Sequence, residues 1–353
     1  MEEPVHIADV VIIGGGQSGL AMGYYLRRTG LSFVILDEQA QPGGSWLHTW
    51  HSLKLFSPAE HSSLPGWLMP KTEDEYPGKA QVVNYLAEYE KKYNLPVERP
   101  VKVEKVVYTP EGYTIHTTAG LWQAKAVVSA TGSWHTPYVP EYPDRHLYLG
   151  YQIHSAHYQK AEDFAGKKVL IVGGGNSSAQ ILAEVSKVAH TTWVTEKEPT
   201  FLPDEVDGRY LFEFATRQYK ARQEGKTIQP VGSLGDIVMV ASVKEARQRN
   251  VLHSVRPFKK FTATGVHWPD GREEEFDAVI WCTGFKPALD HLQPLGVIEA
   301  DGKVLTNETK AVKSPGLWLV GYGSWTGYAS ATLIGVGRTA RSTAEEIAKE
   351  LRK

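Results

Sequence analysis

Two copies of one strand–turn–helix–strand unit predict an α/β fold with two Rossmann-like dinucleotide-binding domains. The first copy begins with VVIIGGGQSGL at residues 10–20, and the second with KVLIVGGGNSSA at residues 168–179. An acidic residue follows each pattern at the same spacing, where the next apolar strand ends. After the second copy, GLWLVGYG at residues 316–323 is typical of a strand and turn that return the chain to the first domain. We therefore expect the second domain to be inserted in the first.

The first glycine pattern gives each glycine a separate task. Gly14 allows a tight turn out of the strand, Gly16 lets a pyrophosphate approach bare backbone, and Gly19 lets the helix pack closely. The first N–H groups of the helix and its dipole favour the phosphates. Asp37 ends the next strand, where a carboxylate accepts hydrogen bonds from ribose hydroxyls. The alternative is a plain glycine-rich turn, which the repetition of the whole unit disfavours.

The second pattern has Gly173 and Gly175 in the same places, with Ser178 as the third residue. Serine is small enough there, because the third position serves only close packing of the helix. Glu196 takes the place that Asp37 has in the first copy. The sequence therefore predicts two dinucleotide sites on one chain.

The chain length of 353 residues suits two domains. We expect residues 1–162 and 289–353 to form the outer domain and residues 163–288 the inserted one. Between the repeats, the patterning predicts a helix over 80–94 and antiparallel strands around the turn at 110–112. Further helices are expected over 208–225 and 331–353.

Composition excludes several classes of function. A net charge of −2 provides no basic surface for nucleic acid or anionic membranes. The start, MEEPVHIADVV, lacks the basic and apolar parts of a secretion signal, and no apolar run approaches the roughly 20 residues of a spanning helix. We therefore expect a soluble, cytoplasmic protein with no membrane partner.

The single cysteine, Cys282, excludes an internal disulfide, a CxxC redox pair and a cysteine zinc site. A disulfide reductase with two redox cysteines is excluded for the same reason. The 13 histidines show no HExxH or comparable spacing, so no metal site is expected.

Two stretches after Asp37 are candidates for the surroundings of a cofactor. The pair Gly43-Gly44 predicts a tight loop near the nucleotide, although most such pairs are ordinary turns. Residues 52–78 are rich in proline, serine and aromatic residues and show little periodicity. Because a long irregular segment within a compact domain is usually functional or disordered, we interpret this one as a pocket lining.

Seven segments together resemble the flavin-containing monooxygenases, a family of class B flavoprotein monooxygenases, and the length resembles the short bacterial members. The segments are GGGQSGL, QPGGSW, ATG at 130–132, YLGYQIHSAHY at 148–158, VGGGNSSAQ, CTG at 282–284 and LVGYG near Gly321. The most specific is Tyr148-x-Gly150-x-x-x-His154, which resembles the Phe-x-Gly-x-x-x-His linker of the family and is expected to act as a hinge. Tyr158 stands where Baeyer–Villiger enzymes usually have tryptophan, so the match is closer to the heteroatom-oxidising branch.

The resemblance implies that the outer domain binds FAD and that the inserted domain binds NADH and/or NADPH. The implied FAD-side residues are Gly14, Gly16, Gln17, Ser18, Gly19, Asp37, Glu38, Gly44, Ser45, Trp46, Val103, Ala130, Thr131, Gly132 and Gly321. The implied nicotinamide-side residues are Gly173, Gly175, Asn176, Ser177, Ser178, Glu196, Lys197, Thr283 and Gly284, with Tyr148, Gly150 and His154 in the linker. Phe56 and Ser57 are the flavin-adjacent candidates for a catalytic role. For His154 alone, an ordinary structural histidine is the alternative.

Two positions depart from the family. Glu196 stands where NADPH-using relatives usually have arginine, and an acid repels a 2′-phosphate but suits ribose hydroxyls. Lys197 partly offsets that repulsion. Because Glu196 suits ribose hydroxyls, we expect NADH to be accepted as well as or better than NADPH. Phe56 stands where the long enzymes of the branch place an asparagine over the flavin. A phenyl ring excludes water but donates no hydrogen bond, which disfavours a long-lived peroxyflavin.

The resemblance implies a monooxygenase that takes hydride from NAD(P)H and forms a C4a-hydroperoxyflavin with O2. One oxygen atom then passes to a soft nucleophile, in sulfoxidation or N-oxidation, with some Baeyer–Villiger activity within the family's range. The alternative is an NAD(P)H oxidase or quinone-type reductase that releases hydrogen peroxide. A regulatory dinucleotide sensor is a second alternative, which two complete sites disfavour. The expected partners are a small-molecule substrate and O2, and a homodimer is the default assembly.

Overall fold

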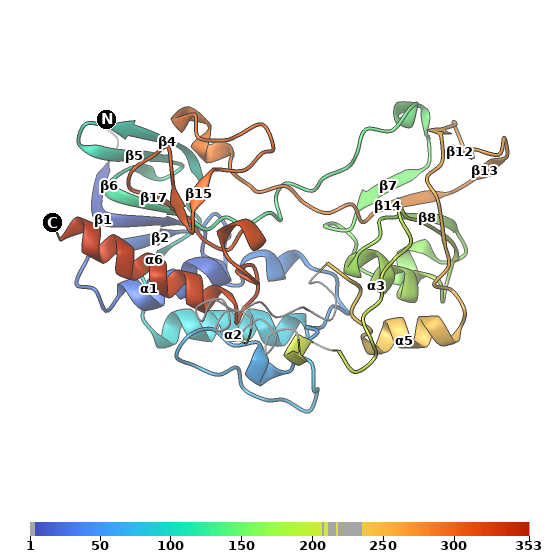
Figure 1. Cartoon of the computed structure of the whole chain (residues 1–353), viewed down its shortest axis with the longest axis horizontal. Helices are drawn as coiled ribbons and strands as arrows, with labels where there is room; N and C mark the ends of the chain where they lie inside the picture. The colour runs from blue at the N-terminus through green and yellow to red at the C-terminus, as the bar shows by residue number, and fades with distance from the viewer. Residues whose placement is uncertain (1–3, 207, 211–216, 218–234, 353) are drawn as a thin grey trace. The chain divides into compact units, whose positions relative to one another are not determined.

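The computed structural model describes residues 4–206, 208–210, 217 and 235–352 (Figure 1). The chain forms two compact units. Unit 1 consists of Met1–Leu47, Ser57–Thr136 and Lys286–Lys353, and unit 2 consists of His48–Phe56 and Pro137–Phe285. The predicted α/β class, with one parallel-sheet unit inserted in another, is confirmed. The assignment of 1–162 and 289–353 to FAD and of 163–288 to NAD(P)H stays a prediction.

Unit 1 is built on a nine-stranded sheet of described residues. Its order is β15-β16-β17-β6-β1-β2-β3, and β5 joins β4 to β6. Because β1 pairs in parallel with β2 and β6, and β6 with β17, the carboxyl ends of these four strands meet at one edge. The strands are β1 (Val5–Ile13), β2 (Phe33–Leu36), β3 (Val97–Glu98), β4 (Val103–Thr109), β5 (Gly112–Thr117), β6 (Gly120–Ser129), β15 (Thr306–Asn307), β16 (Lys310–Ala311) and β17 (Leu317–Leu319).

Three α-helices accompany this sheet among the described residues. They are α1 (Gln17–Leu26), α2 (Lys79–Lys92) and α6 (Val336–Leu351), and α6 lies alongside α1 (Figure 1). The short 3-10 helices of unit 1 are η1 (Gly44–His48), which ends one residue beyond the unit, η2 (Ala59–His61), η5 (Asp290–Leu295) and η6 (Ser324–Thr326). The 3-10 helix η3 (Arg145–Leu147) belongs to unit 2. The core of unit 1 joins β1, β2, β4, β5, β6 and β17 to η5 through buried aliphatic side chains.

Unit 2 contains a five-stranded sheet in the order β10-β9-β8-β14-β7, in which every neighbouring pair is parallel. The strands are β7 (Tyr151–His154), β8 (Lys168–Val172), β9 (His190–Val194), β10 (Ser254–Val255) and β14 (Ala278–Trp281). Along β8, Val169 and Ile171 belong to one buried cluster, and Leu170 and Val172 to another. Because side chains alternate between the two faces of a strand, both faces of this sheet are buried, as in a doubly wound unit.

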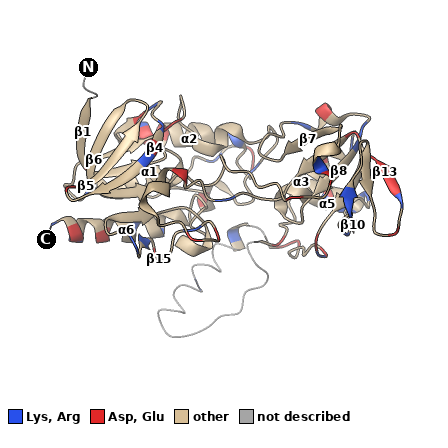
Figure 2. Cartoon of the chain, turned by 90° about the horizontal axis from the view of Figure 1, so that it is seen from above, with Lys and Arg blue, Asp and Glu red and all other residues tan. Residues whose placement is uncertain are grey.

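The remaining elements of unit 2 surround this sheet. Helices α3 (Asn176–Val185) and α5 (Ala241–Gln248) pack together, and η4 (Ala161–Phe164) contacts α3. A small antiparallel sheet is formed by β11 (Lys260–Phe261), β12 (Gly265–His267) and β13 (Glu273–Glu275). Figure 2 shows basic and acidic segments interspersed along the ribbon, with β13 red because its three residues are glutamates.

Most of these elements are predicted by patterns in the sequence. The predicted strands of both glycine units, the helix over 80–94 and the hairpin around Gly112 are confirmed as β1, β2, β8, β9, α2 and β4–β5. The prediction that the last helix starts at 331 is wrong, because α6 begins at Val336. Before it, Thr332 folds back: its hydroxyl donates to the Ala329 carbonyl and accepts from the Gly335 N–H. Most of the predicted helix over 208–225 lies outside the described residues. Among the described residues, no helix has both the length and the hydropathy needed to cross a membrane.

Candidate functional site

The turn after β1 has the close contacts that require glycine. Gly14 has φ +106°, and a Cβ added there would lie 2.6 Å from the Ala130 carbonyl oxygen. A Cβ added to Gly19 would lie 1.9 Å from the carbonyl oxygen of Gly14. At Gly16 the nearest atom to an added Cβ is the Gly44 Cα, at 3.8 Å. The turn is therefore closed toward the sheet and open at its middle glycine, which is the geometry that a pyrophosphate needs.

The start of α1 lies against two loops of the same unit. Gly16 is its N-cap residue and has no side chain to bond the first N–H groups of the helix. The Gln17 amide donates to the Ala331 carbonyl at 2.6 Å and accepts from the Trp46 indole N–H at 3.4 Å. Ser18 is buried, and its hydroxyl would lie 2.0 Å from a Cβ added to Gly321. The loops at 44–47 and 321–331 therefore frame a helix N-terminus suited to anions.

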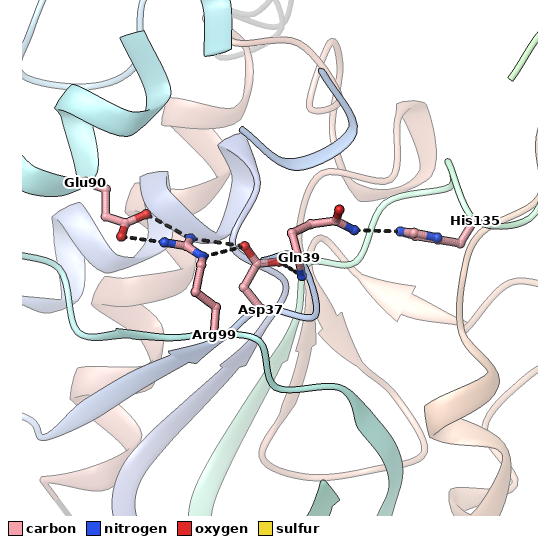
Figure 3. A network of polar contacts seen from close by, with 5 residues as sticks. All are labelled: Asp37, Gln39, Glu90, Arg99 and His135. Carbon is pink, nitrogen blue, oxygen red and sulfur yellow. Dashed lines mark hydrogen bonds and ion pairs between the residues drawn. The ribbon is translucent and has the colours of Figure 1, made fainter. Parts of the chain in front are cut away.

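The acidic residue just after β2, Asp37, is part of a partly buried ion-pair network (Figure 3). Arg99 donates to Asp37 Oδ2 through Nε at 3.1 Å and through a terminal nitrogen at 3.0 Å. Its other edge binds both oxygens of Glu90, at 2.6 and 2.9 Å. Asp37 Oδ1 accepts the Gln39 N–H at 3.3 Å. Since a carboxylate oxygen accepts two hydrogen bonds, Oδ1 has capacity for a ribose hydroxyl.

Next to Asp37, Glu38 forms a half-exposed ion pair with His135, with 2.7 Å between Oε1 and Nε2. The hydrogen bond to Glu38 raises the pKa of His135, while burial of the ring opposes the shift. The pair therefore joins the segment after β2 to the segment after β6. Sequence reasoning included Glu38 and missed His135, which has no pattern of its own around it.

A buried polar cluster lies at the carboxyl end of β6. The Tyr322 hydroxyl is 2.5 Å from the Ser129 hydroxyl and 2.7 Å from the Thr131 hydroxyl, and it accepts the Thr131 N–H at 3.2 Å. His291 Nε2 is 3.0 Å from the Ser129 hydroxyl, and burial lowers the pKa of His291 to about 4. The cluster fixes the Ala-Thr-Gly segment at 130–132. Sequence reasoning missed Tyr322 and His291, because their partners are far away along the chain.

The remaining residues assigned to the FAD side have simpler surroundings. Ser45 and Trp46 lie in η1, and Val103 starts β4 at the margin of the core of unit 1. Gly44 has φ +54°, and a Cβ there would lie 2.8 Å from the Gly16 Cα. The loop at 44–46 therefore approaches the open side of the first glycine turn closely.

The two catalytic candidates fall in different units. Phe56 ends the first segment of unit 2 and packs against Leu202, Val206 and Val238. Ser57 starts the next segment of unit 1, where it is buried and its hydroxyl is 2.7 Å from the Ser62 hydroxyl. A role of either residue beside the flavin stays a prediction.

The turn after β8 repeats the first one in unit 2. Gly173 has φ +137°, and a Cβ there would lie 2.2 Å from the Cys282 carbonyl oxygen. A Cβ added to Gly175 would meet no atom within 4 Å among the described residues. Ser178 is fully buried, and its hydroxyl donates to the Gly175 carbonyl at 2.7 Å. Serine therefore fits the third position and leaves the middle of the turn open.

Around this turn, several predicted side chains bond to neighbouring backbone. Asn176 donates to the Asp236 carbonyl at 3.0 Å and accepts the Val238 N–H at 2.8 Å, so its amide holds a loop. Ser177 is half-buried in the first turn of α3. Thr283 donates to the Tyr138 carbonyl, and Gly284 has φ +82°. Glu196 and Lys197 are exposed after the end of β9, where their charges reach solvent or a ligand.

The linker motif has a structural role within unit 2. The Tyr148 hydroxyl donates to the Phe276 carbonyl at 2.7 Å, and burial raises its pKa to about 12. A Cβ on Gly150 would lie 2.2 Å from that hydroxyl oxygen. His154 Nδ1 accepts the Ala156 N–H at 3.0 Å, and burial lowers the pKa of the ring. These contacts suit a residue that fixes the chain path more than a proton donor.

The single cysteine is shielded by the protein. Cys282 is buried, and burial raises the pKa of its thiol. A dithiol is impossible with one cysteine. In the part of the chain that the structure describes, no group of three or more His, Cys, Asp or Glu side chains could hold a metal ion.

Known proteins are similar to this chain over nearly its whole length. A family model for pyridine nucleotide-disulphide oxidoreductases matches residues 11–321. The structure of a flavin-containing monooxygenase from Stenotrophomonas maltophilia is 51% identical in sequence, with a TM-score of 0.90 over 98% of this chain and 99% of that chain.

Two curated relatives match at lower identity. The uncharacterized oxidoreductase CzcO of Bacillus subtilis (strain 168) is 31% identical over 349 residues, 97% of this chain and 99% of the relative. Indole-3-pyruvate monooxygenase YUCCA1 of Oryza sativa subsp. japonica is 27% identical over 380 residues, 97% of this chain and 91% of the relative. The similarity therefore extends over both glycine turns.

Proposed function

The chain belongs to the pyridine nucleotide-disulphide oxidoreductase family and, within it, to the flavin-containing monooxygenases, and we propose that it oxygenates a soft nucleophile at the expense of NADH. It is a flavin-dependent oxidoreductase with FAD and NAD(P)H as its cofactors. The proposed reaction consumes NADH, a proton, O2 and a thioether, and yields NAD⁺, water and a sulfoxide. The same balance holds for an amine and its N-oxide.

The observation that carries the proposal is the pair of glycine turns, each open at its middle glycine and each followed by a helix capped by glycine. In unit 1 these features fit FAD: the turn from Gly14 to Gly19 would hold the pyrophosphate, and Asp37 would accept the ribose hydroxyls. When bound, FAD supplies the redox chemistry, accepting a hydride and activating O2. The protein contributes binding, orientation and exclusion of water.

In unit 2 the turn from Gly173 to Ser178 would hold the pyrophosphate of the nicotinamide cofactor. Two such sites on one chain supply an electron donor and an electron acceptor, which supports turnover over a purely regulatory role. The Tyr148 hydroxyl and His154 Nδ1 of the linker motif bond to backbone in unit 2, so these two atoms do not form an acid–base pair. Oxygen transfer to a thioether or amine requires none, because the nucleophile supplies its own lone pair.

The proposed preference for NADH rests on the exposed carboxylate of Glu196 after β9. The ribose of a dinucleotide lies at the end of this strand in a Rossmann unit. A carboxylate accepts hydrogen bonds from the ribose hydroxyls of NADH and repels the 2′-phosphate of NADPH. Lys197, also exposed, reduces that repulsion, so NADPH remains usable.

The substrate class follows from the branch that the sequence resembles. We propose thioethers and amines as substrates, with slower oxidation of carbonyl compounds. O2 and the small-molecule substrate are the partners of the reaction. The protein is proposed to work in the cytoplasm as a homodimer.

Coupling of NADH to product tests this function. Purified protein with FAD is supplied with NADH, O2 and methyl p-tolyl sulfide, and NADH consumption, sulfoxide and hydrogen peroxide are measured together. We expect sulfoxide to account for most of the NADH consumed. One hydrogen peroxide per NADH with no sulfoxide, for this and other thioether and amine substrates, would instead establish the oxidase alternative.

A further inference from the structure

An arginine that is absent from the glycine patterns lies beside the predicted ribose end of unit 2. Arg256 directly follows β10, which pairs in parallel with β9, so both strands end at the same edge. The Thr195 N–H, just after β9, donates to the Val255 carbonyl at 3.0 Å. Arg256 therefore adjoins the strand end from which Glu196 extends, although 60 residues of chain separate the two.

One edge of the Arg256 guanidinium is anchored to the protein. A terminal nitrogen donates to the Thr195 carbonyl at 3.1 Å and to the Thr195 hydroxyl at 2.8 Å. The other terminal nitrogen donates to the Ser254 hydroxyl at 3.1 Å. These contacts fix the plane of the guanidinium. The Arg256 side chain therefore loses little conformational entropy when a ligand binds to it.

The other terminal nitrogen also forms an ion pair with Glu198. The Glu198 side chain is 80% exposed and that of Arg256 is 43% exposed, so water surrounds much of this pair. Exposed ion pairs are weak, and a phosphate binds the same arginine edge that a carboxylate binds. The Glu198 carboxylate thus occupies a position on Arg256 that suits a phosphate monoester.

We propose that Arg256 is a preformed site for the 2′-phosphate of NADPH and that Glu198 competes for it, so that this ion pair adds to the effect of Glu196 on the choice between NADH and NADPH. The proposal rests on the assignment of unit 2 to the nicotinamide cofactor in the proposed function. It also gives the two acids separate effects. Glu196 favours ribose hydroxyls directly, whereas Glu198 neutralises the anchored cation of Arg256. Removal of Glu198 alone should therefore admit the 2′-phosphate.

Binding of two cofactor fragments tests this. ADP-ribose and 2′-phospho-ADP-ribose are titrated calorimetrically into the FAD-loaded protein at constant ionic strength. In Glu198→Gln, we expect the affinity for 2′-phospho-ADP-ribose to rise about tenfold, since one charge-assisted contact is released to the ligand. The affinity for ADP-ribose should stay unchanged, which also shows that the variant is folded. Adding Arg256→Gln to Glu198→Gln should remove the gain.

A matched control comes from another exposed ion pair of unit 2, between Asp204 and Arg247. Asp204→Asn changes the net charge as Glu198→Gln does and should leave both affinities unchanged. The inference about Arg256 is overturned if ADP-ribose binds but Glu198→Gln does not alter the ratio of affinities. It is also overturned if Arg256→Gln weakens both fragments equally, as expected for stacking on adenine. If neither fragment binds any form of the protein, the assignment of unit 2 fails, and this inference fails with it.

Discussion

Arg99 binds Asp37 through two nitrogens, at 3.1 and 3.0 Å from the same carboxylate oxygen, Oδ2. The second oxygen, Oδ1, accepts the Gln39 N–H instead (Figure 3). The arginine thus fixes the orientation of the acid that we assign to the ribose of FAD. Its side chain is 11% exposed, and its other edge binds the Glu90 carboxylate.

The first prediction concerns this arginine. Arg99→Gln leaves the buried Asp37 and the partly buried Glu90 without their cation, and breaking a buried ion pair costs about 3–5 kcal/mol. We expect the free energy of unfolding in urea, measured with excess FAD, to fall by about that amount. Lys125→Gln removes the exposed partner of Asp9 in the same unit and should cost less than about 1 kcal/mol. Equal stabilities of the two variants would contradict the structural role of Arg99.

The second prediction concerns the first glycine turn. In Gly14→Ala, the new methyl group lies 2.6 Å from the Ala130 carbonyl oxygen, in a backbone conformation that disfavours side chains. We expect the purified variant to lose its flavin, seen as loss of the absorbance near 450 nm relative to 280 nm. Gly30→Ala is the matched control, because Gly30 also has a positive φ but no neighbouring atom within 4 Å of an added Cβ. A Gly14→Ala protein with a full complement of flavin would refute the assignment of this turn.

The third prediction concerns cofactor choice. Glu196→Arg replaces an exposed acid at the end of β9 with a group that binds phosphate. We expect the ratio of kcat/KM for NADPH to that for NADH to rise about tenfold or more. Glu273→Arg, on the exposed strand β13, makes the same charge change and should leave the ratio as it is. An unchanged ratio in Glu196→Arg would remove the basis for the NADH preference.

The fourth prediction concerns acid stability. Burial holds the pKa of His291 at about 4, below its ordinary value of 6.5. Between these values the unfolded chain binds a proton at this position and the folded protein does not. The free energy of unfolding therefore falls as the pH drops from 6.5 to 4, by about 3 kcal/mol for this group.

His291→Gln removes that contribution while keeping a hydrogen-bonding partner for Ser129. Urea unfolding of the natural protein and of His291→Gln at pH 7 and pH 4.5 measures this contribution, because the two proteins share all other titrating groups. The variant should lose less stability on acidification than the natural protein. The same loss in both would show that His291 is protonated in the folded state.

Local patterns in the sequence were sufficient for the elements that carry the glycine turns. Gly14 and Gly173 each follow an apolar strand and precede a helix, and the repeat of that order left few alternatives. The turn at Gly112 and the helix that became α2 also follow from neighbouring residues alone. The start of α6 could not be predicted from neighbouring residues, because Thr332 and Gly335 form a local turn that competes with the helix.

The residues that orient the candidate sites could not be found in this way. Arg99, Tyr322 and Arg256 acquire their roles through partners that lie 61 to 193 residues away along the chain. Their placement depends on which strands end at the same edge of a sheet. In the case of Arg99, the strand that carries it to that edge, β3, has only two residues and leaves no periodic signal. A weak signal exists for Arg256, a basic residue just after a short apolar segment of the second unit.

We propose that one oxygen atom of O2 passes to the substrate at the expense of NADH. The most direct test is turnover of the purified, FAD-loaded protein with NADH and methyl p-tolyl sulfide under ¹⁸O2, with mass spectrometry of the product. We expect a sulfoxide that carries one ¹⁸O atom and forms only when NADH is present. Unlabelled sulfoxide, or NADH consumption that ends entirely in labelled hydrogen peroxide, would contradict it.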